Sequence, residues 1–159
     1  MLIRRDALSY GAEVLIRRPL TERLYGWLSY TLSTSLRALG NGVVGPSDWD
    51  QRHVVNLVVG YRIGRYTFGG RAHLNTGRPI QLATESGYAR LPAYEQIDLR
   101  FDRRYVFKSF SLELYAELQN ATLSRQVTSV DYFPTPNGVM MSETSYRIIL
   151  PSIGIHGEM

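Results

Sequence analysis

The feature that most constrains the fold is a strict alternation of apolar and polar residues over long stretches of the chain. It is clearest between Glu95 and Phe107. One side of this segment carries Ile97, Leu99, Phe101, Tyr105 and Phe107, and the other carries Gln96, Asp98, Arg100, Asp102 and Arg104. Because successive side chains of a β-strand point to opposite faces, this period of two predicts a strand with one apolar and one charged face.

The same alternation recurs along most of the chain, so we expect an all-β fold of about seven long strands. The other predicted strands are Tyr10–Arg17, Leu24–Ser33, His53–Arg62, Tyr66–Asn75, Phe110–Gln119 and, approximately, Tyr146–Met159. Consecutive strands joined by hairpins form an antiparallel meander.

The predicted connections are alternately short and long. The short ones are Arg18–Arg23, Ile63–Arg65 and Lys108–Ser109, and the long ones are Leu36–Arg52, Gly77–Ala93 and Ala121–Ser145. Barrels of the bacterial outer membrane have short turns on the periplasmic side and long loops outside. The strands are also longer than is usual in soluble domains, and their polar faces carry charges of both signs. We therefore predict antiparallel transmembrane β-barrel strands.

Composition narrows the possible functions. The 159 residues include no cysteine, which excludes disulfides and thiolate chemistry. The formal charge of +4 is spread along the chain, so no clustered basic footprint for nucleic acid is present. No window approaches the roughly 20 consecutive apolar residues of a membrane-spanning helix. A barrel strand needs only about 10 alternating residues, so this composition still permits a membrane protein.

An odd number of strands predicts an incomplete barrel. Single-chain bacterial barrels have even strand counts, and an open sheet would leave unpaired backbone groups in lipid. The N-terminal segment from Met1 to Asp6 also lacks the apolar core and the cleavage site of a secretory signal. We therefore expect residues 1–159 to be one segment of a larger barrel whose signal peptide lies upstream.

Several segments, in order, resemble the closing barrel strands of TonB-dependent outer-membrane receptors, especially the plug-containing, carboxypeptidase-regulatory-like type common in myxobacteria. The segments are Gly11-Ala-Glu-Val-Leu-Ile-Arg-Arg, Tyr25-Gly-Trp-Leu-Ser-Tyr, Asp50-Gln-Arg-His-Val-Val-Asn, Thr76-Gly-Arg-Pro, Arg90-Leu-Pro-Ala-Tyr-Glu-Gln-Ile-Asp-Leu-Arg, Leu114-Tyr-Ala-Glu-Leu-Gln-Asn and Leu150-Pro-Ser-Ile-Gly-Ile-His-Gly-Glu-Met. The resemblance implies a barrel of 22 strands around an N-terminal plug, in the outer membrane of a Gram-negative bacterium. It also implies TonB-driven import of a scarce ligand such as a ferric siderophore, cobalamin or a glycan. The plug and the TonB-contacting segment are absent from this sequence, so the segment alone is not expected to transport.

The resemblance further implies a role for the last strand, whose alternating residues are read by the barrel-assembly machinery in this family. The matching positions are Ile153, Ile155, Gly157 and Met159. Met159 departs from the usual terminal aromatic residue, so the signal is either weakened or atypical. The same residues are also expected to face lipid.

No catalytic or metal-binding pattern accompanies the strands. His53, His73 and His156 lie on three different predicted strands, and no glycine-rich phosphate loop is present. We therefore predict no enzyme activity, no metal site and no cofactor. The polar residues expected to line the lumen are Arg71, His73, Asp98, Arg100, Asp102, Glu113 and Glu117. Because inward charges in a barrel must be paired, mutual pairing is the stronger expectation for these residues.

The long loops are better places to look for ligand specificity, because loops carry binding residues that a rigid scaffold positions. Trp49, Tyr132 and Phe133 are the aromatic candidates there, and each could equally pack its loop against the barrel rim.

Two other architectures share the alternating pattern. A soluble sandwich or lipocalin-like barrel also has alternating strands, but needs its apolar outer faces covered. A small complete structural or adhesion barrel would need one further strand, for which Thr128–Phe133 is the plausible source.

Overall fold

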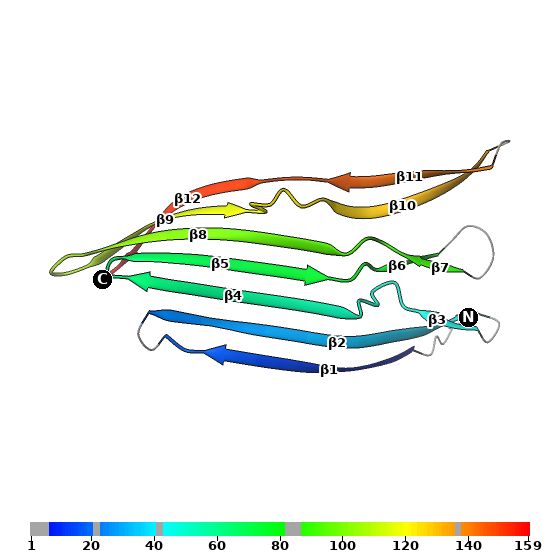
Figure 1. Cartoon of the computed structure of the whole chain (residues 1–159), viewed down its shortest axis with the longest axis horizontal. Helices are drawn as coiled ribbons and strands as arrows, with labels where there is room; N and C mark the ends of the chain where they lie inside the picture. The colour runs from blue at the N-terminus through cyan, green and yellow to red at the C-terminus, as the bar shows by residue number, and fades with distance from the viewer. Residues whose placement is uncertain (1–6, 21–22, 41–42, 82–86, 136–137) are drawn as a thin grey trace.

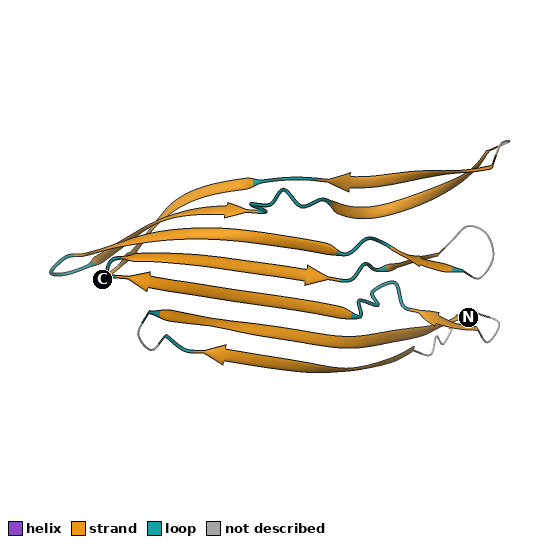
Figure 2. Ribbon diagram, in the orientation of Figure 1, coloured by secondary structure: helices purple, strands orange, loops and turns teal. Residues whose placement is uncertain are grey.

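The computed structural model of the chain describes all residues except 1–6, 21–22, 41–42, 82–86 and 136–137. Its regular structure consists entirely of β-strands, joined by turns and loops (Figure 2). In the part that is described, no helix is long and apolar enough to cross a membrane. The predicted all-β class is confirmed.

Long antiparallel strands form one main sheet in chain order (Figure 1). They are β1 (Ala7–Arg18), β2 (Leu24–Gly40), β4 (His53–Ile63), β5 (Tyr66–Asn75), β8 (Tyr94–Val106), β9 (Ser111–Gln119) and β12 (Leu150–Glu158). Each pairs only with its neighbours in this order, apart from short strands in the loops. The seven predicted strands and their meander are therefore confirmed, and the structure moves strand ends by a few residues.

Short connections gather at one end of the sheet and long ones at the other (Figure 1). Only Gly64 and Arg65 join β4 to β5, and Gly64 has a φ of 58°. Glycine adopts this conformation without steric cost, which is why two-residue hairpins favour it. At the next short turn, the Phe107 amide donates to the Phe110 carbonyl at 2.9 Å, and the two rings stack with centroids 4.5 Å apart. The alternation of short and long connections is confirmed.

The long connections contain strands that the sequence analysis did not predict. β3 (Val43–Pro46) pairs with the end of β2, which itself runs on to Gly40. β6 (Pro79–Gln81) pairs with β7 (Tyr88–Arg90), and β10 (Gln126–Thr135) pairs with β11 (Gly138–Tyr146). Thr128–Phe133 is thus part of a strand, but β10 and β11 form a separate two-stranded sheet. The segment does not supply another strand of the main sheet.

The two faces of the main sheet differ sharply in chemistry. On the apolar face, cross-strand rows such as Leu28, Leu57 and Ala72 follow from the register of the strands. The polar face carries the alternate residues, including the row of Arg71 and Asp98. Most apolar residues of the strands therefore lie on one shared face, as the alternation predicts, and Trp27 and Val58 are exceptions on the other face.

Burial on these faces is the reverse of that in a soluble domain. Side chains of the apolar face are exposed, with Leu99 at 51% and Ile153 at 86%. Two acids of the polar face are buried, with Asp98 at 5% and Asp102 at 8% exposed. Among the described residues, Leu91 is the one buried hydrophobic residue. The sheet has no apolar core of its own.

The sheet is a single open layer. Substantial contacts between strands are all made by hydrogen-bonded neighbours, so no second layer covers either face within the described ranges. β1 and β12 each have one neighbouring strand and one free edge. The described strands thus form an open antiparallel sheet, and they do not close into a barrel.

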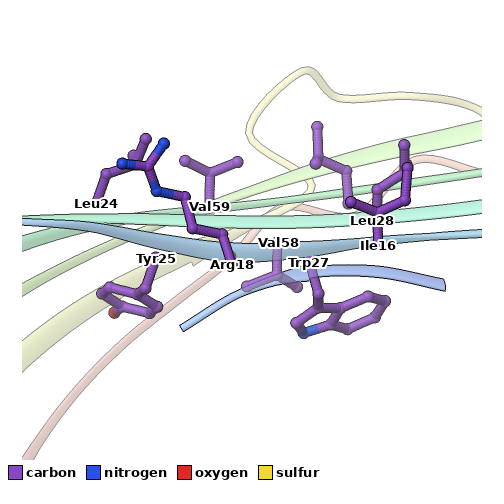
Figure 3. Close-up of a pocket in the computed structure, with 10 residues that line it drawn as sticks. Ile16, Arg18, Leu24, Tyr25, Trp27, Leu28, Val58 and Val59 are labelled. Atoms are coloured by element: carbon purple, nitrogen blue, oxygen red, sulfur yellow. The ribbon is translucent and has the colours of Figure 1, made fainter. Parts of the chain in front are cut away.

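A shallow apolar hollow of about 190 Å³ lies where β1, β2 and β4 meet (Figure 3). Leu24, Leu28 and Val59 stand on one side of the sheet there, and Trp27 and Val58 stand on the opposite side (Figure 3). Gly26 lines this hollow and lies opposite Val59 on the apolar face.

We predict that Gly26→Ala destabilises the sheet by about 1–3 kcal/mol, the usual cost of overpacking. A Cβ at Gly26 would clash with the Val58 carbonyl and lie 3.2 Å from the Val59 Cα, both of which are backbone atoms. Gly70 flanks Val59 on the other side of the same cross-strand row, and a Cβ there meets nothing within 4 Å. Gly70→Ala is therefore the matched control. Urea titration followed by tryptophan fluorescence measures both, and equal free energies of unfolding would contradict the prediction.

Candidate functional site

The polar face brings together all the residues predicted to line a lumen. β5 contributes Arg71 and His73. The others come from β8 and β9, and they are Asp98, Arg100, Asp102, Glu113 and Glu117. Because the register fixes these positions, the residues form one continuous polar surface across three neighbouring strands.

Asp98 is the most buried charge of this surface, and its carboxylate is fully engaged. Arg71 Nε donates to Oδ2 at 2.7 Å, while Gln96 Nε2 and the Asn120 amide donate to Oδ1 at 2.7 and 2.8 Å. Such charge-assisted hydrogen bonds offset the cost of burying the carboxylate. Asp98 is therefore a structural anchor of β8 and not a free ligand for a solute.

Asn120, which the sequence analysis did not single out, extends this anchor into the loop after β9. Its side-chain amide donates to the carbonyls of Ser124 at 3.0 Å and Ile148 at 2.9 Å, and its Oδ1 accepts from the Ser124 amide at 2.8 Å. Its φ of 52° is one that asparagine tolerates better than most residues. Asn120 thus closes the base of the loop that carries β10 and β11.

Arg100 is the centre of a second cluster on the same face. Its guanidinium lies 2.7 Å from Asp102, 3.5 Å from Glu117 and 3.9 Å from Glu113. It also stacks over the Tyr115 ring at 4.2 Å. One cation thus compensates several acids, which confirms the expectation that the polar residues pair with one another.

The histidines are dispersed. His73 Nδ1 lies 2.6 Å from Asn56 Oδ1 on the polar face, whereas His53 Nδ1 lies 2.9 Å from the Tyr30 hydroxyl on the apolar face. Within the described ranges, no group of three or more histidine, aspartate or glutamate residues is placed to hold a metal ion.

The loop end of the sheet contains an ion pair with a buried carboxylate, which joins two long connections. We call Ser35, Asp50, Gly77 and Arg90 the rim cluster. Asp50 precedes β4, is 2% exposed, and pairs with Arg90 of β7. Arg90 Nη1 also donates to the carbonyls of Asp50 at 2.8 Å and Gly77 at 3.1 Å, and the Ser35 amide donates to Asp50 Oδ1 at 2.7 Å. The sequence analysis did not identify this cluster.

Opposing effects act on the pKa of Asp50. Burial raises it, but the hydrogen bond from the Ser35 amide and the charge of Arg90 together outweigh burial, so the pKa lies below its usual value of 3.8. The carboxylate is therefore charged at neutral pH and holds the two connections together through its ion pair.

Trp49, a predicted ligand contact, stands beside the rim cluster. Its side chain is 75% exposed, and the Arg78 guanidinium lies 5.1 Å from the centre of its ring. Arg78 Nη2 also donates to the Thr128 carbonyl of β10 at 3.4 Å. The three long connections therefore meet around Trp49 and Arg78, which form an exposed aromatic and cationic surface.

The other two loop candidates lie further along β10. Phe133 is 47% exposed and Tyr132 is half-buried. In the part of the chain that is described, no ring contact joins them to Trp49. The structure therefore groups Trp49 with Arg78 and not with Tyr132 and Phe133.

The residues of the predicted assembly signal lie on the apolar face of β12. Ile153 pairs in register with Ala116, and Ile155 pairs with Leu114. Gly157 lies on the same face and Met159 follows the strand, and both are exposed. One edge of β12 is free.

Comparisons with known protein families, with curated proteins and with solved structures found no match for this chain.

We predict that Asp50→Asn increases hydrogen exchange at the Ser35 amide, because the charge-assisted contact of the buried Asp50 carboxylate with Arg90 is lost at a cost of about 1–3 kcal/mol. Asp48→Asn is the matched control. It removes the same charge two positions away, from an ion pair with Arg37 in which Asp48 is 61% exposed. Exposed pairs contribute little, so exchange at Ser35 should stay unchanged in this control.

Acid should act on the same contact in the unsubstituted chain. Because the folded pKa of Asp50 is lowered, its stabilisation is complete above pH 3.8 and is lost as the pH falls through the folded pKa. The fluorescence of Trp49, in a Trp27→Phe background, reports this transition. If Asp50→Asn showed the same acid transition, Asp50 would not be its cause.

Proposed function

We propose that this chain is the C-terminal part of an outer-membrane β-barrel receptor, of the TonB-dependent type, that imports a scarce ligand. The observation that carries the proposal is the burial pattern of the sheet, with exposed apolar side chains on one face and two buried, ion-paired carboxylates on the other. In water this arrangement is unfavourable, because it exposes a continuous apolar surface. In a membrane the same surface faces lipid and the charged face lines a lumen.

The dimensions of the apolar face support a membrane setting. On β8 the run of apolar residues that no charge interrupts, Ile97 to Phe101, lies between Glu95 and Arg103 on this face. At about 3.3 Å per residue, these limits are about 26 Å apart along the strand. A tilt of about 40° reduces this to about 20 Å of height, near the apolar band of about 25 Å in outer-membrane barrels.

The directions of the two edge strands support a larger barrel. The main path holds seven strands, each antiparallel to the next, so β1 and β12 run in the same direction. If β1 paired directly with β12, the two strands would be parallel. The same would hold in a ring of identical copies, where β12 of one copy would pair with β1 of the next. Antiparallel closure needs an odd number of further strands between β12 and β1, and lipid requires closure because unpaired edges are costly there.

The receptor assignment rests on the resemblance of the sequence segments to the receptor family and on the residues around the rim cluster. In this proposal the remaining strands and the plug complete the barrel, TonB supplies energy through the plug, and the barrel-assembly machinery recognises β12. Ligand contacts would come from exposed loop residues such as Trp49 and Arg78, since the lumen charges already compensate one another. The proposal includes no catalytic step and no cofactor.

Two alternatives have less support. A small barrel of eight long strands lacks its additional strand, because β10 pairs with β11 away from the main sheet. A soluble ligand-binding barrel needs a cover for its apolar outer face, and no described element provides one.

The membrane assignment predicts alternating solvent contact along β8. The chain contains no cysteine, so single cysteines carrying nitroxide labels can be placed at will. In lipid vesicles, labels at Ile97 and Leu99 should collide mainly with oxygen, and labels at Gln96 and Arg100 mainly with a water-soluble nickel chelate. Absence of alternation, or a monomer that folds cooperatively without detergent, would contradict the assignment.

The uptake assignment is tested in the host cell. Deleting the gene should lower the accumulation of one labelled ligand class, among ferric siderophores, cobalamin and glycans, under starvation for that ligand. Loss of TonB should lower it equally, because transport through such a receptor depends on TonB. Unchanged accumulation of all three classes would rule out the receptor function and leave the membrane assignment intact.

A further inference from the structure

Two arginines interrupt the apolar face of the main sheet. Arg18 ends β1 and lies opposite Gly26, and Arg103 of β8 lies opposite Tyr66 and Leu114. Among the described residues, neither guanidinium has a carboxylate within ion-pair distance. This contrasts with Arg71 and Arg100 on the polar face, whose charges are compensated. The two outward charges therefore lack a partner among the described residues.

Aromatic rings surround Arg103. Its guanidinium lies 5.4 Å from the centre of the Tyr66 ring and 4.8 Å from that of Tyr105. Tyr66 stacks in turn on Phe101, with ring centroids 5.8 Å apart. Arginine and tyrosine together on an outward face are typical of the boundary between hydrocarbon and headgroups, where the apolar part of each side chain is in lipid and its polar end reaches water.

Arg18 has a comparable apolar setting. Its side chain extends along the hollow of the apolar face beside Leu24 and Val59 (Figure 3). Arg18 and Arg103 both lie close to short connections, which gather at one end of the sheet (Figure 1). In a barrel, short turns lie at one membrane surface, so both guanidinium groups would reach the same leaflet.

We propose that Arg18 and Arg103 bind the phosphate groups of anionic lipids in the leaflet next to the short turns. The inference rests on the membrane assignment made above. Guanidinium groups form two parallel hydrogen bonds with phosphate oxygens, and a headgroup supplies the negative charge that the sheet does not. The tyrosine rings hold Arg103 at the height of the headgroups through cation–π contacts.

The sequence provides a matched control, because each outward arginine has an arginine neighbour on the polar face. Arg17 precedes Arg18 and lies opposite Trp27, on the other face of β1 and β2. Arg104 follows Arg103 and lies 3.1 Å from Glu158. R18Q/R103Q and R17Q/R104Q therefore remove the same charge from the same strands, but from opposite faces.

The test is the partition of the full chain into phosphatidylcholine vesicles with and without phosphatidylglycerol, measured by flotation. For the unsubstituted chain, phosphatidylglycerol should strengthen partition. In R18Q/R103Q the increase in partition caused by phosphatidylglycerol should be about five-fold smaller per arginine, or about 25-fold smaller in total. The reason is that a basic residue at an anionic surface contributes on the order of 1 kcal/mol. R17Q/R104Q should lose less than about two-fold, because its side chains do not reach lipid.

Each outcome is decisive. If the two double variants respond equally to phosphatidylglycerol, the arginines act only through net charge and the lipid site is overturned. If the chain enters phosphatidylcholine vesicles but ignores phosphatidylglycerol, the lipid site alone is overturned. If the chain enters neither kind of vesicle, the membrane assignment fails and the lipid site fails with it.

Discussion

The structure depends on the backbone hydrogen bonds between long antiparallel strands, because the described part of the sheet has no apolar core to hold it together. A soluble domain is stabilised mainly by a buried apolar core. Here, among the described residues, the only buried hydrophobic side chain is Leu91. Hydrogen bonds contribute little net stability in water, where the unfolded chain finds equal partners, and much more where water is excluded. A sheet built this way is stable where its apolar face is removed from water.

The polar face then sets the register of the strands. A slip of one residue would turn every apolar side chain to the other face. It would also separate Arg71 from Asp98 and remove the Asn120 amide from the same carboxylate. The charges that the sequence analysis considered as lumen contacts therefore align the strands and hold the loop base. Their mutual compensation leaves the exposed loops as the place where a ligand would meet unpaired groups.

The sequence predicted the features that depend on neighbouring residues and missed those that depend on contacts between distant residues. Alternation is a local signal, so it predicted the strands, their faces and the alternating connections. β6 and β7 were missed because three-residue strands are too short to show a period, and Pro79 gives a loop-like composition. Asp50 and Arg90 were missed because their contact joins positions forty residues apart. Asp50 and Arg90 are each the first residue of a segment that resembles the receptor family. That resemblance was the available signal.

Two adjacent residues at the rim cluster differ sharply in exposure. Asp50 is almost completely buried and holds two connections together, while Trp49 beside it is 75% exposed. Arg90 donates to the Asp50 carbonyl and the Ser35 amide donates to the Asp50 carboxylate, so the exposed ring is carried on an ordered support and would lose less conformational entropy if it bound a ligand. A flexible loop would lose more. In the proposed receptor, the ion pair of Asp50 would therefore make Trp49 the loop aromatic best placed to bind a ligand, whereas sequence reasoning alone ranked it level with Tyr132 and Phe133.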